Sequence, residues 1–397
     1  MEEIRGIIAE YAEKQRETYR QIALDIHARP EVSNYEFFAC QRLSDQLRAE
    51  GFTVTVDVAG HRTGFTGVYK AEKPGPVLVF LAEYDALAGL GHGCGHNLLG
   101  TTSCLAAAAL RQVIDRTGGE VRVYGTPGEE GGENGSAKGS FVREGFLRDV
   151  DAALCVHPGD KNVTTTVTLA CAPVDIEFWG KASHAAAAPE KGINALDALI
   201  LTYNGINALR QHVTDDVRIH GIITHGGDAP NTVPEYAAGK FFLRAATAPG
   251  LENVYQRVDA IVAGAAAMTG ARGRMQPSQN RVENTVVTPS FDQVYIREMA
   301  ELGCPVRIGL PEDCIGSSDV GNISQVVPTI QPTICITDGP TPWHTETSKA
   351  AACSEKGLAS IVLGAKALAL TALDLIEDPA LLAAIKAEHA AEVAKQG

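Results

Sequence analysis

Apolar residues follow two spacings in the first part of the chain. Three stretches have the spacing of amphipathic helices: residues 4–11, 37–47 and 98–114. Four stretches have the character of strands: residues 52–58, 76–81, 121–124 and 152–156. The stretch at 76–81 (PVLVFL) is apolar throughout, as in a central strand that is covered on both faces. Strands that alternate with helices predict an α/β domain with a mostly parallel sheet.

The middle of the chain has a different order of elements. Three stretches alternate as strands: residues 174–179, 217–224 and 238–244. Two stretches lie between and after them and have the length of helices: residues 195–211 and 251–268. This order predicts an antiparallel sheet with two helices on one face.

Beyond about residue 285 the chain is expected to return to the first domain. A strand is predicted at residues 333–336, a long helix over residues 348–375 and an amphipathic helix over residues 379–395. The simplest architecture is a smaller α+β domain inserted into a larger α/β domain. The expected boundaries are residues 1–170, 171–285 and 286–397.

Composition and charge exclude several classes of partner. The 397 residues carry 34 lysines and arginines against 48 aspartates and glutamates, a formal net charge of −14. An acidic protein is repelled by phosphate backbones, so no nucleic-acid partner is expected. The most apolar stretch, residues 357–375, is interrupted by Lys366, so no membrane span is expected. Nine scattered cysteines and the lack of a recognisable secretory signal predict a cytoplasmic protein.

A glycine-rich segment with possible metal ligands follows the strand at 76–81. It reads G-H-G-C-G-H-N over residues 91–97 and contains Cys94 and His96. Thiolate and imidazole are good ligands for zinc and similar metals. The alternative is a glycine-rich turn in which the cysteine and histidine occur by chance.

Two adjacent carboxylates follow the strand at 121–124. Glu129 and Glu130 lie in the segment G-T-P-G-E-E-G-G. Neighbouring carboxylates repel each other unless a cation lies close by. A metal would relieve this repulsion, with one carboxylate as ligand and the other as a base facing bound water. The alternative is a solvated acidic loop.

Two further histidines follow predicted strands. His157 comes after residues 152–156, and His344 comes after residues 333–336. Either histidine alone could equally be a hydrogen-bonded core residue. However, open α/β sheets bind ligands at the carboxyl ends of their strands. Together the clusters predict two divalent metal sites with a shared ligand, built from Cys94, His96, Glu130, His157 and His344.

The inserted domain has its own polar candidates. His184 lies in G-K-A-S-H-A, Asn231 lies in N-T-V-P, and Arg244 ends the strand at 238–244. Imidazole, carboxamide and guanidinium groups suit an oxyanion and a substrate carboxylate. Each could also be an ordinary exposed polar side chain.

Taken together, seven segments resemble a known family. They are A-E-Y-D-A-L, G-H-G-C-G-H-N, G-T-P-G-E-E-G-G, C-V-H-P, G-K-A-S-H-A, N-T-V-P and W-H-T, in this order. The sequence resembles the aminoacylase/carboxypeptidase family of metal-dependent amidohydrolases, peptidase family M20. Within it, the sequence is most similar to the branch that holds hippurate hydrolase, the indole-acetyl-amino-acid hydrolases and aminobenzoyl-glutamate hydrolase. The resemblance implies a two-metal catalytic domain with an inserted lid that also makes a homodimer contact.

The resemblance also implies a role for each candidate residue. It implies five metal ligands: Cys94, His96, Glu130, His157 and His344. It implies that Glu129 is the general acid/base and that Asp85 orients a ligand. In the lid, it implies that His184 stabilises the oxyanion. Asn231 and Arg244 would hold the substrate carboxylate.

Two positions depart from the pattern of many relatives. Glu83 stands where many of them have a metal-binding histidine, and Asn97 stands where the hippurate-type branch has aspartate. Both changes suit the aminobenzoyl-glutamate subgroup. They leave open how many ions bind tightly and which metal they are. The expectation is two divalent ions per chain, zinc first, with manganese, cobalt or nickel as alternatives.

The expected activity is hydrolysis of the amide bond of an N-acyl amino acid with a free carboxylate. A dipeptidase or a carbamoyl-amide hydrolase would use the same site. A protein of another class would be a metal-binding, non-catalytic subunit of a hetero-oligomer. A hydrolase that uses Cys94 as nucleophile with His96 is a further alternative. Residues 316–322 are expected to line the substrate site because they are small and polar.

Overall fold

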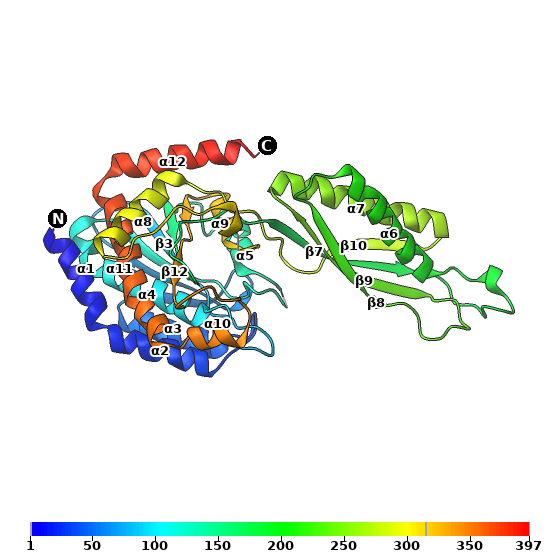
Figure 1. Cartoon of the computed structure of the whole chain (residues 1–397), viewed down its shortest axis with the longest axis horizontal. Helices are drawn as coiled ribbons and strands as arrows, with labels where there is room; N and C mark the ends of the chain where they lie inside the picture. Colours follow the sequence, from blue (N-terminus) through cyan, green and yellow to red (C-terminus); the bar gives the residue numbers. More distant parts are fainter. Residues whose placement is uncertain (1, 133, 314–315, 397) are drawn as a thin grey trace. The chain divides into compact units, whose positions relative to one another are not determined.

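The computed structural model describes residues 2–132, 134–313 and 316–396, which form two compact units (Figure 1). The larger unit contains the residues up to Thr168 and those from Thr285 to Lys395. The smaller unit contains Leu169–Asn284. The smaller unit is therefore an insertion in the chain of the larger one.

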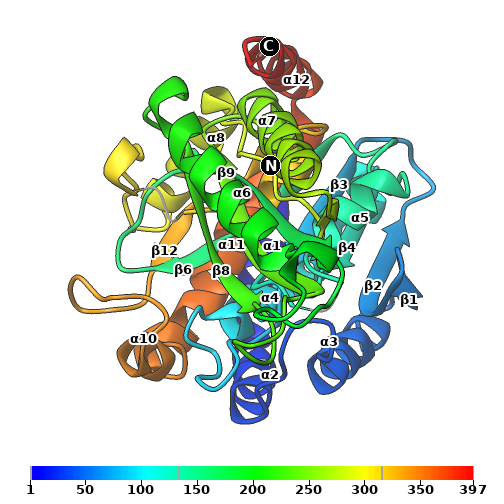
Figure 2. The same ribbon diagram turned by 90° about the vertical axis from the view of Figure 1, so that its right-hand side faces the viewer.

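A six-stranded mixed sheet, in the order β1-β2-β4-β3-β5-β11, forms the centre of the larger unit. Its strands are β1 (Thr53–Val58), β2 (His61–Lys70), β3 (Val77–Ala82), β4 (Glu120–Gly125), β5 (Ala152–Leu154) and β11 (Thr329–Ile330). Strands β4, β3, β5 and β11 are parallel, whereas β1 and β2 are antiparallel and lie at one edge (Figure 2). The expected mostly parallel sheet is confirmed, with this hairpin as an addition. Strand β2 was not predicted, because its glycines and threonines blur any alternation.

Both faces of the sheet are covered, which explains the apolar run in β3. Leu78 and Phe80 belong to a core with α4, α11 and the N-terminal helices, whereas Val79 and Leu81 belong to a core with α5 and α9. The helices of this unit are α1 (Glu2–Lys14), α2 (Arg16–Ala28), α3 (Phe37–Ala49), α4 (His96–Thr117), α5 (Ala137–Arg143), α8 (Pro289–Glu301), α9 (Val320–Ser324), α10 (Glu346–Ala351), α11 (Glu355–Glu377) and α12 (Pro379–Ala394).

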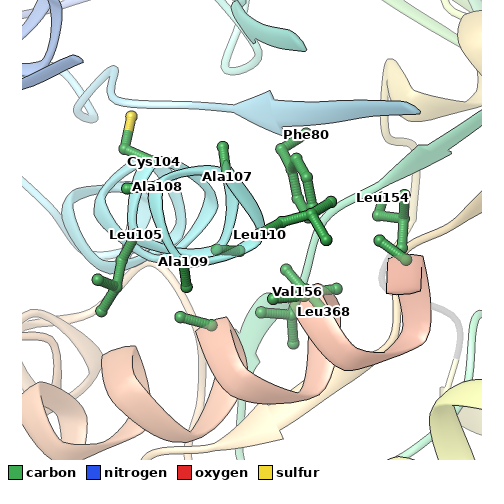
Figure 3. Packing of buried hydrophobic residues seen from close by; sticks show 14 of the residues in the cluster. Phe80, Cys104, Leu105, Ala107, Ala108, Ala109, Leu110, Leu154, Val156 and Leu368 are labelled. Carbon is green, nitrogen blue, oxygen red and sulfur yellow. The ribbon is translucent and has the colours of Figure 1, made fainter. Parts of the chain in front are cut away.

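Helix α4 is the central helix of the larger core. Figure 3 shows it between β3 and α11, with Leu110 directed toward Phe80. The small side chains of Ala106–Ala109 are all fully buried and let the neighbouring elements approach closely. Because His96 is the first residue of α4, this packing also fixes a candidate ligand.

Two predictions for the C-terminal part were wrong in detail. The single helix expected over residues 348–375 is two helices, because the Ser354 hydroxyl accepts a hydrogen bond from Gly357 N and starts α11 anew. The strand expected at 333–336 is β12 (Thr333–Cys335), which pairs with β6 (His157–Gly159) in a separate two-stranded sheet. Pro332 lacks an N–H group, and it stands between β11 and β12.

One helix in the described part of the chain, α11, is long and apolar enough to cross a membrane by length and composition alone. However, 78% of its most apolar window is buried inside the protein. Packing against α4 therefore accounts for its apolar character.

The smaller unit is a four-stranded antiparallel sheet in the order β10-β7-β9-β8. Its strands are β7 (Ala170–Trp179), β8 (Arg218–His225), β9 (Tyr236–Ala245) and β10 (Arg272–Pro277). Helices α6 (Ala195–Leu209) and α7 (Ala248–Thr269) pack together on one face, as Figures 1 and 2 show. The predicted sheet with two helices is confirmed. Strand β10 was missed because arginine and glycine dominate its first half.

We expect Leu110→Ala to lower the free energy of unfolding of the larger unit by about 2–5 kcal/mol, because it opens a cavity between α4 and β3. Gly264→Ala on the exposed side of α7 is the control, since an added Cβ meets nothing within 4 Å. It should raise stability by up to about 1 kcal/mol. Urea denaturation of both variants measures the difference. Equal stability of Leu110→Ala and the unaltered protein would contradict the central place of α4.

Candidate functional site

The loop between β3 and α4 places Cys94 and His96 at the sheet edge. Gly95 caps α4 with a left-handed φ of 80°, and a Cβ at this position would lie 2.9 Å from Pro158 Cγ. Glycine is required for both reasons. The close approach brings Cys94 Sγ to 3.5 Å from His157 Nε2.

Asp85 connects this loop to the loop with the two glutamates. Its Oδ1 lies 2.9 Å from His96 Nδ1, and its Oδ2 accepts a hydrogen bond from Glu130 N at 2.9 Å. Since an ionised carboxylate only accepts, Nδ1 carries the proton and His96 Nε2 is left for another partner. Burial alone would raise the pKa of Asp85, but His96 and the hydrogen bonds hold it below its usual range. Asp85 therefore orients His96, as the resemblance implies.

The glutamate loop is held by a buried carboxylate from outside the predicted site. Glu36 accepts hydrogen bonds from Gly128 N at 3.1 Å, Asn34 N at 2.7 Å and Thr63 Oγ1 at 2.8 Å. Gly128 has a left-handed φ of 77°, and a Cβ there would lie 2.5 Å from Gly135 O. These contacts fix the backbone immediately before Glu129.

His157 and His344 reach the same place from two other segments. His157 is the first residue of β6 and contacts Pro158 O through Nδ1 at 2.8 Å, which leaves Nε2 toward Cys94. His344 is half-exposed and has a left-handed φ of 59°. Its Nε2 lies 3.5 Å from Glu130 Oε1.

Helix α10 ties the segment of His344 to the cysteine loop. Thr345 caps this helix, and Ser348 Oγ donates to Gly93 O at 2.7 Å. The position of His344 therefore depends on the same loop that carries Cys94.

The expected ligand atoms converge. Within the described residues, three groups have ligand atoms that all lie within 4.8 Å of one another: Cys94, His96 and His157; Cys94, Glu130 and His344; and His96, Glu129 and Glu130. Cys94 belongs to two of these groups, as a shared ligand would. His96 Nε2 and Glu130 Oε1 are buried without a hydrogen-bond partner in the described part of the chain. The donor set and these two unsatisfied atoms fit divalent cations.

Burial governs the titration of the site. It raises the pKa of Glu129 well above its usual range, with a further contribution from Glu83 and Glu130. It lowers the pKa of His157 to about 4, and it raises the pKa of the Cys94 thiol. Burial would also lower the pKa of His96, but Cys94 and Asp85 raise it above its ordinary value. The site thus contains more buried acid than its own side chains neutralise.

Two charged residues next to the site were not singled out from the sequence. Lys138 on α5 is fully buried, with Nζ 2.8 Å from Glu83 Oε1 and 2.5 Å from Asp319 Oδ1. A lysine in the segment S-A-K-G-S carries no sequence signal of burial, since lysine is almost always exposed. The odd acidic residue at position 83 was the one available hint.

A pocket of about 470 Å³ opens next to the candidate ligands. Cys94, Glu129, Glu130, His157 and His344 line one part of it. Ser317 and Ser318 also line it, which agrees with the expectation for residues 316–322. The rest of the lining includes Asp160, Lys161, Glu312 and Asp313.

The three candidates of the inserted domain lie in the smaller unit. His184 is exposed, and its Nδ1 accepts hydrogen bonds from Ala186 N and Ala187 N at 3.2 and 3.1 Å. Asn231 is also exposed. Arg244 near the end of β9 is half-buried, with its guanidinium 5.5 Å from the ring centre of Phe242. Their roles remain those that the resemblance implies.

Comparisons with known proteins agree with this geometry. The model of the M20 peptidase dimerisation domain matches residues 172–268. The Xaa-Arg dipeptidase of Mus musculus is 36% identical over 321 residues, 78% of this chain and 73% of the mouse protein. A subunit of the p-aminobenzoyl-glutamate hydrolase of Escherichia coli is 40% identical over 290 residues, 68% of this chain and 59% of the bacterial protein.

A solved structure has the same fold. A dinuclear metal-binding peptidase of the M20 family from Bacillus subtilis superimposes with a TM-score of 0.63. The match covers 91% of this chain and 99% of that one at 19% identity. The likeness therefore shows the shared fold.

We expect Glu36→Gln to change how stability depends on pH. Burial, followed by the nearby Asp85, raises the pKa of Glu36 to about 8. The folded protein thus binds more protons than the unfolded chain between about pH 4 and pH 8, and its stability falls as pH rises through this window. Glu36→Gln removes this loss, so its stability relative to the unaltered protein should rise from pH 5 to pH 8 in urea denaturation.

The exposed Glu346→Gln is the matched control, since it also removes one carboxylate. It should follow the unaltered protein at both pH values. If Glu36→Gln behaved in the same way, Glu36 would not be the proton-binding anchor of the glutamate loop.

Proposed function

Because the chain belongs to the M20 peptidase family, we propose that its pocket is a two-metal site that hydrolyses the amide bond of an N-acyl amino acid or dipeptide. Members of this family are hydrolases of amide and peptide bonds. The observation that carries the proposal is the convergence of the five candidate ligands on Cys94, with Glu129 beside them. The substrate would carry a free carboxylate on the amino-acid side.

Two ions would be held by two sets of donors that share Cys94. One set is Cys94, His96 and His157, and the other is Cys94, Glu130 and His344. Zinc is the proposed metal, because a thiolate, imidazoles and a carboxylate are its usual ligands; manganese, cobalt and nickel are alternatives. Such ions supply an activated water and polarise a carbonyl oxygen.

Glu129 is the proposed general acid/base. It lies beside His96 and Glu130 but is needed in neither of the two ligand sets. Its raised pKa suits a group that accepts a proton from water and returns it to the leaving amine. Glu130 is committed to His344 and, through its backbone, to Asp85, so the two adjacent carboxylates have different tasks.

The smaller unit would supply the substrate contacts. His184 is proposed to stabilise the oxyanion, and Asn231 and Arg244 are proposed to bind the free carboxylate of the substrate. The match to a dimerisation domain supports an oligomer, for which we propose a homodimer through the smaller unit. A hetero-oligomer is the alternative, because the bacterial relative is named as one subunit of its enzyme.

A cysteine hydrolase is the weaker reading. A nucleophilic cysteine needs a lowered pKa, whereas burial raises the pKa of Cys94. In addition, Asp85 directs Nε2 of His96 into a group of metal-type donors. Cys94 is better explained as a ligand.

The substrate side chain divides the two relatives, since arginine is basic and glutamate is acidic. In the pocket, Asp313 is paired with Arg307 and Lys161, whereas Asp160 and Glu312 make no ion pair within the described residues. Two carboxylates without an ion pair in the lining favour a cationic group. A dipeptide with a basic residue is therefore our second candidate substrate.

We expect Glu129→Gln to lower kcat by about 10²–10⁴-fold while the metal content per chain stays unchanged. The amide keeps the size of the side chain but cannot accept the proton of water. Metal analysis of the purified protein and turnover of p-aminobenzoyl-glutamate measure the two effects. Glu130→Gln is the matched control and should lose bound metal, because Glu130 is a proposed ligand. A Glu129→Gln variant with normal turnover would remove the base assignment.

We expect Xaa-Arg and Xaa-Lys dipeptides to be cleaved with a higher kcat/KM than dipeptides that end in glutamate, if the second candidate is right. Asp160→Asn should narrow this preference, because it removes one of the two carboxylates of the pocket that make no ion pair in the described part of the chain. Steady-state kinetics on a matched series of dipeptides gives the ratio. A preference for p-aminobenzoyl-glutamate over all dipeptides would instead favour the first candidate.

A further inference from the structure

A buried ion-pair cluster lies directly beneath the candidate metal site. Glu83 follows β3, Lys138 lies in the first turn of α5, and Asp319 precedes α9. All three side chains are fully buried, and the ammonium of Lys138 contacts both carboxylates. Asp319 also accepts a hydrogen bond from Ser136 Oγ. Lys138 thereby joins three segments that border the pocket.

Glu83 lies beside a ligand without being part of a ligand group. Its Oε2 is 3.2 Å from Nε2 of His96, the nitrogen that Asp85 leaves free. Yet none of the groups of donors within 4.8 Å of one another in the described part of the chain includes Glu83. The contact between Lys138 and Oε1 of Glu83 holds the carboxylate away from those groups.

A mobile carboxylate at this distance would interfere with hydrolysis. Catalytic metal sites keep one coordination position open for water or substrate, unlike closed structural sites. A buried carboxylate without a partner is unstable and binds to the nearest available cation. Without Lys138, the nearest cation for Glu83 would be an ion held by His96.

We propose that Lys138 is a positioning residue that withholds Glu83 from the metals and so keeps a coordination position open for the hydrolytic water. Asp319 holds the ammonium from the opposite side, so that Lys138 does not follow Glu83 toward the pocket. The inference rests on the proposed two-metal function. It adds a residue outside the ligand sets that decides how many carboxylates reach the ions.

The test compares Lys138→Met, Glu83→Gln and the double variant. Zinc affinity is measured on metal-free protein by competition with a chromophoric chelator, and kcat and KM are measured on the reconstituted enzyme. Lys138→Met should bind one zinc ion about tenfold more tightly and should lose kcat with little change in KM, because Glu83 fills the open position. The double variant should return both values toward those of the unaltered protein, since its amide at position 83 carries no charge to bind the ion.

Glu83→Gln alone keeps the test decisive if Lys138→Met does not fold. Because Glu83 is withheld from the ions, this variant should change zinc affinity by less than about threefold, well below the effect of losing a ligand partner. A loss of one zinc ion in Glu83→Gln would show that Glu83 is a ligand and would overturn the proposal.

Arg122→Met is the matched control for the loss of a buried cation. On β4, Arg122 contacts Glu120 at 2.5 Å and Asp149 at 2.6 Å, so it also pairs with two carboxylates but away from the pocket. It should lower the melting temperature without changing zinc affinity.

The remaining outcomes separate the two proposals. Weaker zinc binding in Lys138→Met that Glu83→Gln does not reverse would assign Lys138 a purely structural role and overturn the inference. An unaltered protein that binds no divalent metal would instead remove the proposed function itself.

Discussion

Buried negative charge is the constraint on which the pocket end of the larger unit depends. Glu83, Asp85 and Asp319 are at most 1% exposed, and Glu129 and Glu130 lie beside them. Ionised carboxylates are stable in such a place only when cations or several hydrogen bonds compensate them. Lys138 compensates two of them, and backbone and histidine N–H groups compensate Asp85. Divalent metals would satisfy the charge that is left.

The scaffold makes this accumulation of charge possible by fixing the backbone around it. The alanines of α4 pack against both β3 and α11, so the start of α4 at His96 has little freedom to move. Gly95 and Gly128 adopt left-handed conformations in crowded surroundings, and Glu36 binds the backbone before Glu129. Rigid support of this kind keeps donor atoms within bonding reach of a common ion.

The two units have separate chemical resources. The larger unit contains all the metal-type donors and the pocket next to them, whereas the smaller unit carries an exposed imidazole, an exposed carboxamide and a half-buried guanidinium. The match of the smaller unit to a dimerisation domain gives it a second task in assembly. Membership of the M20 family therefore agrees with two independent observations, the donor set of one unit and the domain type of the other.

The sequence by itself determined the fold class, the inserted α+β unit and the identity of the five converging donors. It could do so because apolar periodicity is local, and because Cys94, His96 and the adjacent glutamates stand in short segments that need no distant residue to be recognised. Only the tertiary structure decided the split of the last long helix, the move of the strand with Cys335 into a second sheet, and the roles of Glu36 and Lys138. These depend on partners more than 50 residues away in the chain for Lys138 and Glu83, and 92 residues away for Glu36 and Gly128. Burial and ion pairing arise only when the folded chain brings such distant residues together, and no local pattern records them.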